Sequence, residues 1–224
     1  EGVSNAGLPH DLDVDVARLR LMKADHQSQQ YRLEDQLLKV FPRQLEHDTQ
    51  LLEGFAQDRA TLAVHPEPEA EFGGLTVRGS FIEEKEAAGK AILAACKEAA
   101  QGNPVEFGAY RGLTMSIQFD SLANKFRLTL RGAVSHIMEV GSDARGNITR
   151  LTNLIQTLPD RMAKVQARLD ATKQQMAAAK AELGKPFPQE EELKNKSARL
   201  AELDAELNMD QRAVSQEKSA EQER

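Results

Sequence analysis

The sequence predicts an α+β fold: a long antiparallel helical hairpin, coiled-coil-like, with a small βα-plus-antiparallel-meander module inserted at its tip. Both ends of the chain are rich in Ala, Leu, Glu, Gln, Lys and Arg, the better helix formers. The middle holds 10 of the 14 glycines and alternating β-branched runs, which are typical of turns and strands. We expect an N-terminal helical arm at 10–65, an α+β module at 72–143, a C-terminal helical arm at 147–208 and a disordered tail at 211–224.

The N-terminal arm is predicted from a broad apolar face with helical spacing. Three polar residues, Glu34, Asp48 and Arg59, fall on this face. Pro42 lacks a backbone N–H, so it either starts a new helix or bends the existing one. The apolar residues are Leu12, Val16, Leu19, Met22, Tyr31, Leu38, Phe41, Leu45, Leu52, Phe55 and Leu62.

The central module reads as a strand, a helix and then an antiparallel meander. Residues 75–81 predict the first strand and residues 83–100 the helix, which should cover one sheet face and leave the other exposed. The helix face contains Ala87, Ala91, Ile92, Ala95 and Cys96. Turn residues separate the later strands, as hairpins require. These strands are expected at 105–110, 113–119, 126–130 and 134–140.

The C-terminal arm shows the cleanest heptad pattern, from Ile148 to Leu183. We expect Asn147 to cap the helix, and Pro159 to cause a kink or a restart, because the heptad phase continues beyond it. A shorter helix follows Pro188. The simplest burial of both arms is an antiparallel pair within one chain, although a coiled-coil homodimer would use the same stripes.

Composition excludes several classes of protein. The net charge of −6 and pI near 5.5 argue against a generally basic nucleic-acid coat, and the single Cys excludes a disulfide framework. No apolar window is long enough for a membrane span, so we expect a cytoplasmic protein that does not bind membranes. The start at Glu1 suggests an excised piece of something longer. The five dispersed histidines predict no metal, and His136 reads as a satisfied or exposed strand histidine. No cofactor is expected either.

Basic residues form the one cluster that suggests a binding function. Residues 72–150 hold 10 basic and 8 acidic side chains, a net charge of +2 against the −6 of the whole chain. Such a local patch attracts phosphates, and the neighbouring Tyr110 and Phe126 could stack on unpaired bases. A solvated sheet face explains the same charges. The candidate nucleic-acid contacts are Arg78, Arg111, Lys125, Arg127, Arg131 and Arg145.

Several segments resemble a known family. They are HQSQQYRLED at 26–35, LLKVFP at 37–42, YRGLTMSIQFDS at 110–121, VGSDARGNITRL at 140–151 and GKPFPQEEELKNKSARLAELDAELNMD at 184–210. They resemble the C-terminal region of giant proteins of bacterial conjugative, mobile elements, in which a Snf-type DEAD/DEAH-box helicase is fused to an adenine DNA methylase. The resemblance covers about 19–210. It implies the upstream helicase and methylase domains as partners, and DNA as the substrate of the parent protein.

The resemblance brings no catalytic residue, because the chain has no phosphate-binding GxGK[ST] loop, DEAH box or methylase N/D-P-P-Y/F motif. We therefore expect a non-enzymatic accessory module. One hypothesis is that it positions or engages DNA through the basic patch. The alternative is a protein-interaction or dimerisation stalk that does not contact nucleic acid.

Overall fold

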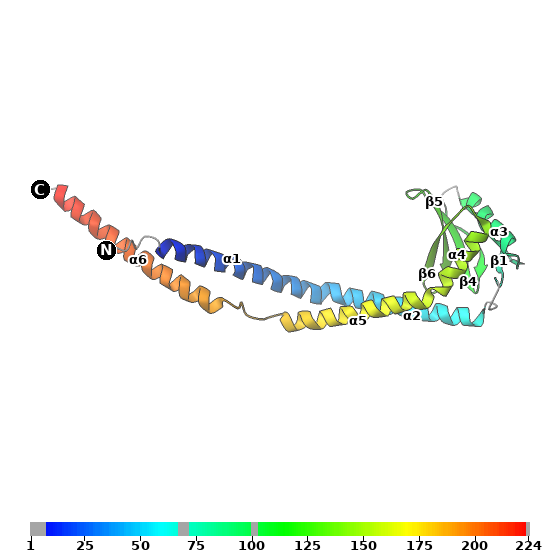
Figure 1. Ribbon diagram of the computed structural model, residues 1–224, viewed down its shortest axis with the longest axis horizontal. Coiled ribbons are helices and arrows are strands. Elements are labelled where there is room, and N and C mark those ends of the chain that lie inside the picture. Colours follow the sequence, from blue (N-terminus) through cyan, green and yellow to red (C-terminus); the bar gives the residue numbers. More distant parts are fainter. Residues whose placement is uncertain (1–7, 67–71, 100–102, 223–224) are drawn as a thin grey trace. The chain divides into compact units, whose positions relative to one another are not determined.

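A computed structural model describes residues 8–66, 72–99 and 103–222 and confirms the α+β class, with long helices and a six-stranded antiparallel sheet (Figure 1). The chain forms two compact units. One is Pro42–Gln174, which contains the sheet. The other combines Glu1–Phe41 with Gln175–Arg224, and its described elements are helices.

The sheet of the first unit has the strand order β2-β1-β3-β4-β5-β6, and every neighbouring pair is antiparallel. The last four strands form the predicted meander, because alternating apolar residues and short turns fix their register. The strands are β1 Leu75–Val77, β2 Ser80–Ile82, β3 Val105–Tyr110, β4 Leu113–Asp120, β5 Lys125–Arg131 and β6 Ser135–Val140.

The single strand predicted at 75–81 is wrong, since this segment is the β1–β2 hairpin. Arg78 and Gly79 form its turn with φ of 50° and 82°. Arg111 and Gly112, between β3 and β4, have φ of 49° and 78°. Two successive residues with positive φ match the twist of a tight hairpin. The same Arg-Gly pair therefore marks both turns.

Two helices cover one face of the sheet, as Figure 1 shows for α3 (Lys85–Ala99) and α4 (Ala144–Gln156). Alternate residues of the strands, such as Met115 and Leu128, point into this core and are fully buried. The helices approach closely at Gly89, where an added Cβ would lie 2.1 Å from the Ala144 carbonyl oxygen. The predicted helix face is correct at Ile92, Ala95 and Cys96, whereas Ala87 is exposed and Ala88 is buried.

Asn147 does not cap the C-terminal arm as expected. Asp143 caps α4 by accepting a hydrogen bond from the Gly146 N–H. Asn147 is buried one turn later and bonds back to the Gly141 backbone, with its Oδ1 2.7 Å from the Gly141 N and its Nδ2 2.9 Å from the Gly141 O. The residue is thus a tether for the strand that precedes the helix.

The C-terminal arm restarts at Pro159. Helix α4 ends at Gln156, and α5 (Leu158–Glu182) begins with Pro159 in its first turn, where the missing N–H has no helical partner to lose. The predicted heptad residues Ile148, Leu158 and Leu169 are buried in the same chain.

The N-terminal arm contains α1 (Leu8–Asp35), a π-helical turn η1 (Gln36–Val40) and α2 (Phe41–Val64). The Phe41 N–H bonds to the Gln36 carbonyl, which is the wider spacing of a π-helix. This turn ends two residues before Pro42, whose ring would clash with the carbonyl one α-helical turn earlier. The helical segment thus accommodates the proline without an interruption between α1, η1 and α2.

In the second unit, α1 packs antiparallel on α6 (Glu190–Gln222). Val16 and Leu19 bury against Phe187 and Leu193, and two ion pairs flank this contact, Lys23 with Glu190 and Asp15 with Lys196. We expected a disordered tail from residue 211, but α6 continues to Gln222. More than half of residues 211–222 are Ala, Glu or Gln, which extend an existing helix at little cost.

Candidate functional site

The open face of the sheet carries three of the six predicted phosphate contacts. Lys125, Arg127 and Arg131 alternate along β5 with residues that point into the core. All three side chains are exposed on the face that α3 and α4 do not cover. The structure therefore brings these three residues together, in line with the expectation of an exposed polar face.

Acidic residues neutralise this face. Lys125 Nζ lies 2.6 Å from Glu139 Oε2, and Arg127 Nη2 lies 2.8 Å from Asp120 Oδ2. Glu106 points to the same face from β3, since it pairs with Ser116. The three basic side chains of β5 thus share this face with three acidic side chains, so their charges cancel. Among the described residues Arg131 has no ion-pair partner, but one arginine is a small footprint for a phosphate backbone.

Asp120 also holds the β4–β5 turn. Its Oδ1 accepts hydrogen bonds from the Leu122 and Ala123 N–H groups at 3.0 and 3.1 Å. The bond from Ala123 is the main reason that the pKa of Asp120 is lowered, and the charge of Arg127 adds to it. The carboxylate is therefore ionised and competes with any phosphate for Arg127.

The other three predicted contacts lie elsewhere and have other partners. Arg78 pairs with Glu98 of α3, and Arg145 Nη2 lies 3.0 Å from Glu86 Oε2 on the same helix. Arg111 donates to the backbone carbonyls of Leu62 and His65 at the end of α2, at 3.0 and 2.8 Å. These arginines join the turns and helices of the module to one another.

Tyr110 cannot stack on a nucleic-acid base as predicted. Its side chain is fully buried, and its hydroxyl lies 3.5 Å from Thr152 Oγ1. Phe126 is partly buried, packs against the core and contacts Phe119, with ring centroids 5.0 Å apart. Both rings belong to the fold.

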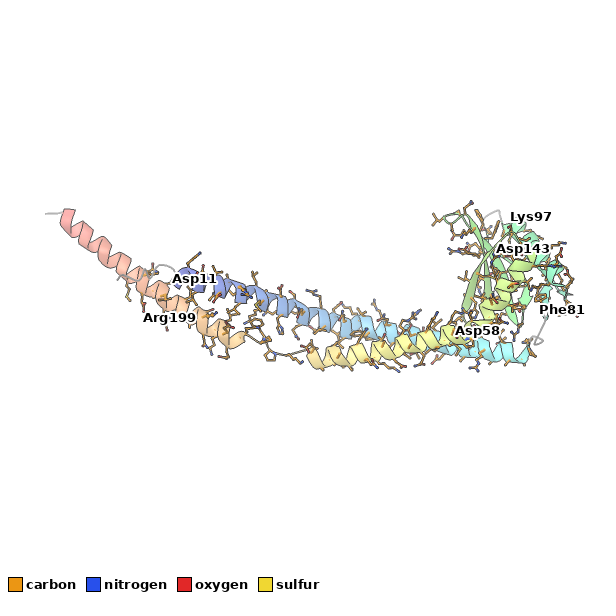
Figure 2. All side chains as sticks on the ribbon, in the orientation of Figure 1. Asp11, Asp58, Phe81, Lys97, Asp143 and Arg199 are labelled. Atoms are coloured by element: carbon orange, nitrogen blue, oxygen red, sulfur yellow. The ribbon has the colours of Figure 1, made fainter. Side chains whose placement is uncertain are left out.

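A buried polar centre that sequence reasoning missed joins α2 to the sheet. Asp58, labelled in Figure 2, is 1% exposed and accepts three hydrogen bonds. The donors are the Ala133 and Val134 N–H groups of the β5–β6 turn, at 2.5 and 3.1 Å, and His136 Nε2 of β6, at 2.9 Å. A carboxylate in such a position fixes both the helix and the turn.

His136 extends this centre to α5. Arg161 Nη1 lies 3.1 Å from His136 Nδ1, and because a guanidinium can only donate, His136 carries its proton on Nε2 and donates it to Asp58. Burial lowers the pKa of His136 and outweighs the hydrogen bond to Asp58, so the ring is neutral. Arg161 also donates to the Leu154 carbonyl at 2.7 Å. Helix α2, strand β6 and helix α5 therefore meet at this histidine. Of the two predictions for His136, the structure confirms the one in which its ring nitrogens have hydrogen-bond partners.

A second buried carboxylate joins α2 to α5. Asp48 is 1% exposed and binds Arg168 through two bonds, Nε to Oδ2 at 2.8 Å and Nη2 to Oδ1 at 2.5 Å. Hydrogen bonding from Arg168 lowers the pKa of Asp48. These two hydrogen bonds from Arg168 explain how Asp48 can lie on the apolar face of the N-terminal arm.

The inner face of α1 is more polar than the sequence predicts. Met22, Tyr31 and Leu38 were expected on it, but all three are exposed. In their place His26 bonds to the Lys185 carbonyl at 3.0 Å, and Gln30 bonds to the Glu182 carbonyl and the Gly184 N–H at 3.3 and 2.7 Å. Polar side chains thus satisfy the backbone between α5 and α6.

Two of these exposed residues, Tyr31 and Leu38, belong to a second stripe, which we call the outer stripe. Its members recur at alternating spacings of three and four along α1 into η1, and in the described structure they are all exposed. The largest are Leu21, Tyr31 and Leu38, at 69%, 73% and 68% exposure. Six of the eight members are apolar or aromatic, and Ser28 and Asp35 are the polar exceptions. The outer stripe consists of Val14, Ala17, Leu21, Ala24, Ser28, Tyr31, Asp35 and Leu38.

No reactive cluster accompanies these surfaces in the parts of the chain that the structure describes. No three His, Cys, Asp or Glu side chains gather there as a metal site. Cys96 is buried on α3 as expected, and burial raises the pKa of its thiol to about 11. Of the described helices, none has the length and hydrophobicity of a membrane span.

Comparison with known proteins adds no relative: no protein-family model, no curated protein and no solved structure matches the chain.

Proposed function

We propose that the chain is a non-catalytic protein-interaction module whose N-terminal helix joins it to another protein chain. The observation that carries this proposal is the outer stripe of α1. Its large apolar side chains stay exposed, although the same helix buries a separate face on α6. Apolar residues at heptad spacing are the usual means by which one helix binds another.

The buried titratable groups support a non-catalytic role. Asp58 and His136 bind each other, the β5–β6 turn and Arg161, and Asp48 binds Arg168. Each of these groups links elements of the fold, and a general acid or base needs a reactant within hydrogen-bond reach. The cytoplasmic setting, and the upstream helicase and methylase domains as neighbours, remain part of the proposal through the family resemblance.

DNA engagement is the second candidate, and one observation favours it. Lys125, Arg127 and Arg131 share the exposed face of β5. Their ion pairs are solvent-exposed, and such pairs are worth about 0–1 kcal/mol. A phosphate could therefore displace Asp120 or Glu139. The residues proposed to contact DNA are therefore the three on β5, whereas the sequence predicted six across the module.

Fluorescence anisotropy of labelled single-stranded and duplex DNA, titrated with the full chain over a salt series, separates the two candidates. The protein-interaction proposal predicts no saturable binding at low salt. Saturable binding would overturn it if the triple variant Lys125→Ala, Arg127→Ala, Arg131→Ala bound more weakly and with a salt slope smaller by about 2.7, which is about 0.9 for each of three phosphate contacts on duplex DNA. The matched control removes three exposed lysines of α5, Lys164, Lys173 and Lys180.

A further inference from the structure

We infer that the outer stripe of α1 binds the same stripe of a second copy of this chain, as a parallel two-stranded coiled coil. The inference rests on the proposed function, because it names the partner of the surface that carries that function. It differs from the homodimer that the sequence left open as an alternative. That dimer used the predicted stripes of both arms, of which only Tyr31 and Leu38 belong to the outer stripe, whereas residues such as Val16, Leu19 and Leu169 are buried within one chain.

The outer stripe has the heptad pattern of a coiled-coil seam. Val14, Leu21, Ser28 and Asp35 occupy the a positions, and Ala17, Ala24, Tyr31 and Leu38 the d positions. Within α1, at 3.6 residues per turn, this seam lies about 160° from the Val16 and Leu19 stripe that packs on α6, and its last member, Leu38, follows in the π-helical η1. A second helix can therefore approach while α6 stays in place.

The charges beside the seam identify the partner and its direction. In a parallel pair, the g residue of one heptad faces the e residue of the partner's next heptad. This rule pairs each g residue of α1 with an e residue of the same sequence, without one like-charge pair. The pairs are Asp13 with Arg18, Arg20 with Asp25, Gln27 with Arg32, and Glu34 with Lys39.

An antiparallel pair fits less well. In that arrangement e residues face e residues, and three of the four along α1 and η1 are basic: Arg18, Arg32 and Lys39. Basic residues would then predominate on both sides of that edge, with Asp25 as its one acid. The charge pattern thus matches a second copy of α1 in parallel orientation.

The flanking residues are free to make these pairs. All eight are exposed, and only Lys39 among them has an ion pair within the described structure, to Asp35 of its own helix. Ser28 and Asp35 are polar residues at a positions, where each meets its own copy in a parallel dimer. The two Asp35 carboxylates repel each other there, so these positions cost stability and restrict the register. We therefore expect a reversible dimer whose population rises with protein concentration.

Sedimentation equilibrium of the full chain over a wide concentration range tests the inference. The mass should rise from 24.8 kDa toward twice that value. Leu21→Glu with Tyr31→Glu should hold it at the monomer value, whereas the control Gln29→Glu with Gln36→Glu, which adds the same charge at exposed positions outside the seam, should not. A monomer at every concentration, or a dimer that ignores Leu21→Glu with Tyr31→Glu, overturns the inference.

A charge reversal tests the orientation. Arg20→Glu places two acids opposite each other in the parallel dimer and should weaken the association about twofold or more, and the added Asp25→Arg should restore it. Failure of this rescue overturns the parallel register. These outcomes are separate from the fate of the proposed function: a monomer that binds no DNA leaves a different protein as the partner of the stripe, whereas DNA binding by β5 overturns the proposed function alone.

Discussion

Replacement of Asp58 by Ala tests the physical account of the module most severely, because one carboxylate holds three donors. The change leaves His136 Nε2, which is fully buried, without its acceptor, and it removes the acceptor of the Ala133 and Val134 N–H groups. A lost bond to a charged, buried acceptor costs about 2–3 kcal/mol. The two turn amides are near solvent and add about 1 kcal/mol together. We expect a total loss of about 3–4 kcal/mol.

Urea denaturation followed by circular dichroism would measure the free energy of unfolding of this variant. Hydrogen exchange of the peptide that spans β5 and β6 would show that the loss is located at the sheet. Asp170→Ala is the matched control, because it removes an exposed aspartate of α5. A loss below about 0.5 kcal/mol for Asp58→Ala would refute the reasoning.

Three further outcomes follow from the same contacts. Burial keeps the pKa of His136 below its ordinary value, so on acidification the histidine is protonated in the unfolded chain before it is protonated in the folded one. The free energy of unfolding should therefore fall as the pH drops below about 6.5. His136→Gln should reduce this dependence on pH in denaturation curves measured between about pH 7 and 5. Arg168→Ala leaves the buried Asp48 unpaired and should cost about 2 kcal/mol in the same assay, and an unchanged midpoint would contradict the pairing. Gly89→Ala forces a methyl group onto the Ala144 carbonyl and should cost about 1–3 kcal/mol, and a neutral result would mean that α3 and α4 cross less closely.

Local patterns predicted most of the fold. Strict alternation in Leu113, Met115 and Ile117 specified β4 and its buried face, and turn residues set the meander. The heptads from Ile148 to Ala179 specified the buried side of α4 and α5. These features depend on residues close in sequence, which is why one sequence is enough to predict them.

Features that depend on partners distant in sequence were missed. The α1 face was predicted from apolar residues alone, but His26 and Gln30 take its place because they bond the backbone between α5 and α6. The sequence placed Asp48 on an apolar stripe, but nothing near it pointed to Arg168. At 75–81, the Arg-Gly pair was the overlooked signal of a hairpin.

The candidate site changed for the same reason. A run of basic residues predicts a positive patch only if no acid from another strand or helix lies opposite. Glu98, Glu86 and Glu139 supply those acids to Arg78, Arg145 and Lys125. The outer stripe could have been predicted from its heptads, because Tyr31 and Leu38 have the spacing of one seam and Val16 and Leu19 that of another.

Disulfide trapping tests the central claim most directly, because it reports the surface, the partner and the orientation together. Ala24→Cys, in a chain whose buried Cys96 is replaced by Ser, places one thiol in the seam. A parallel, in-register dimer brings the two introduced thiols together, so mild oxidation should give a covalent dimer, while the exposed control Gln29→Cys should not. A chain that stays monomeric with Ala24→Cys, or that crosslinks equally with Gln29→Cys, would contradict the account.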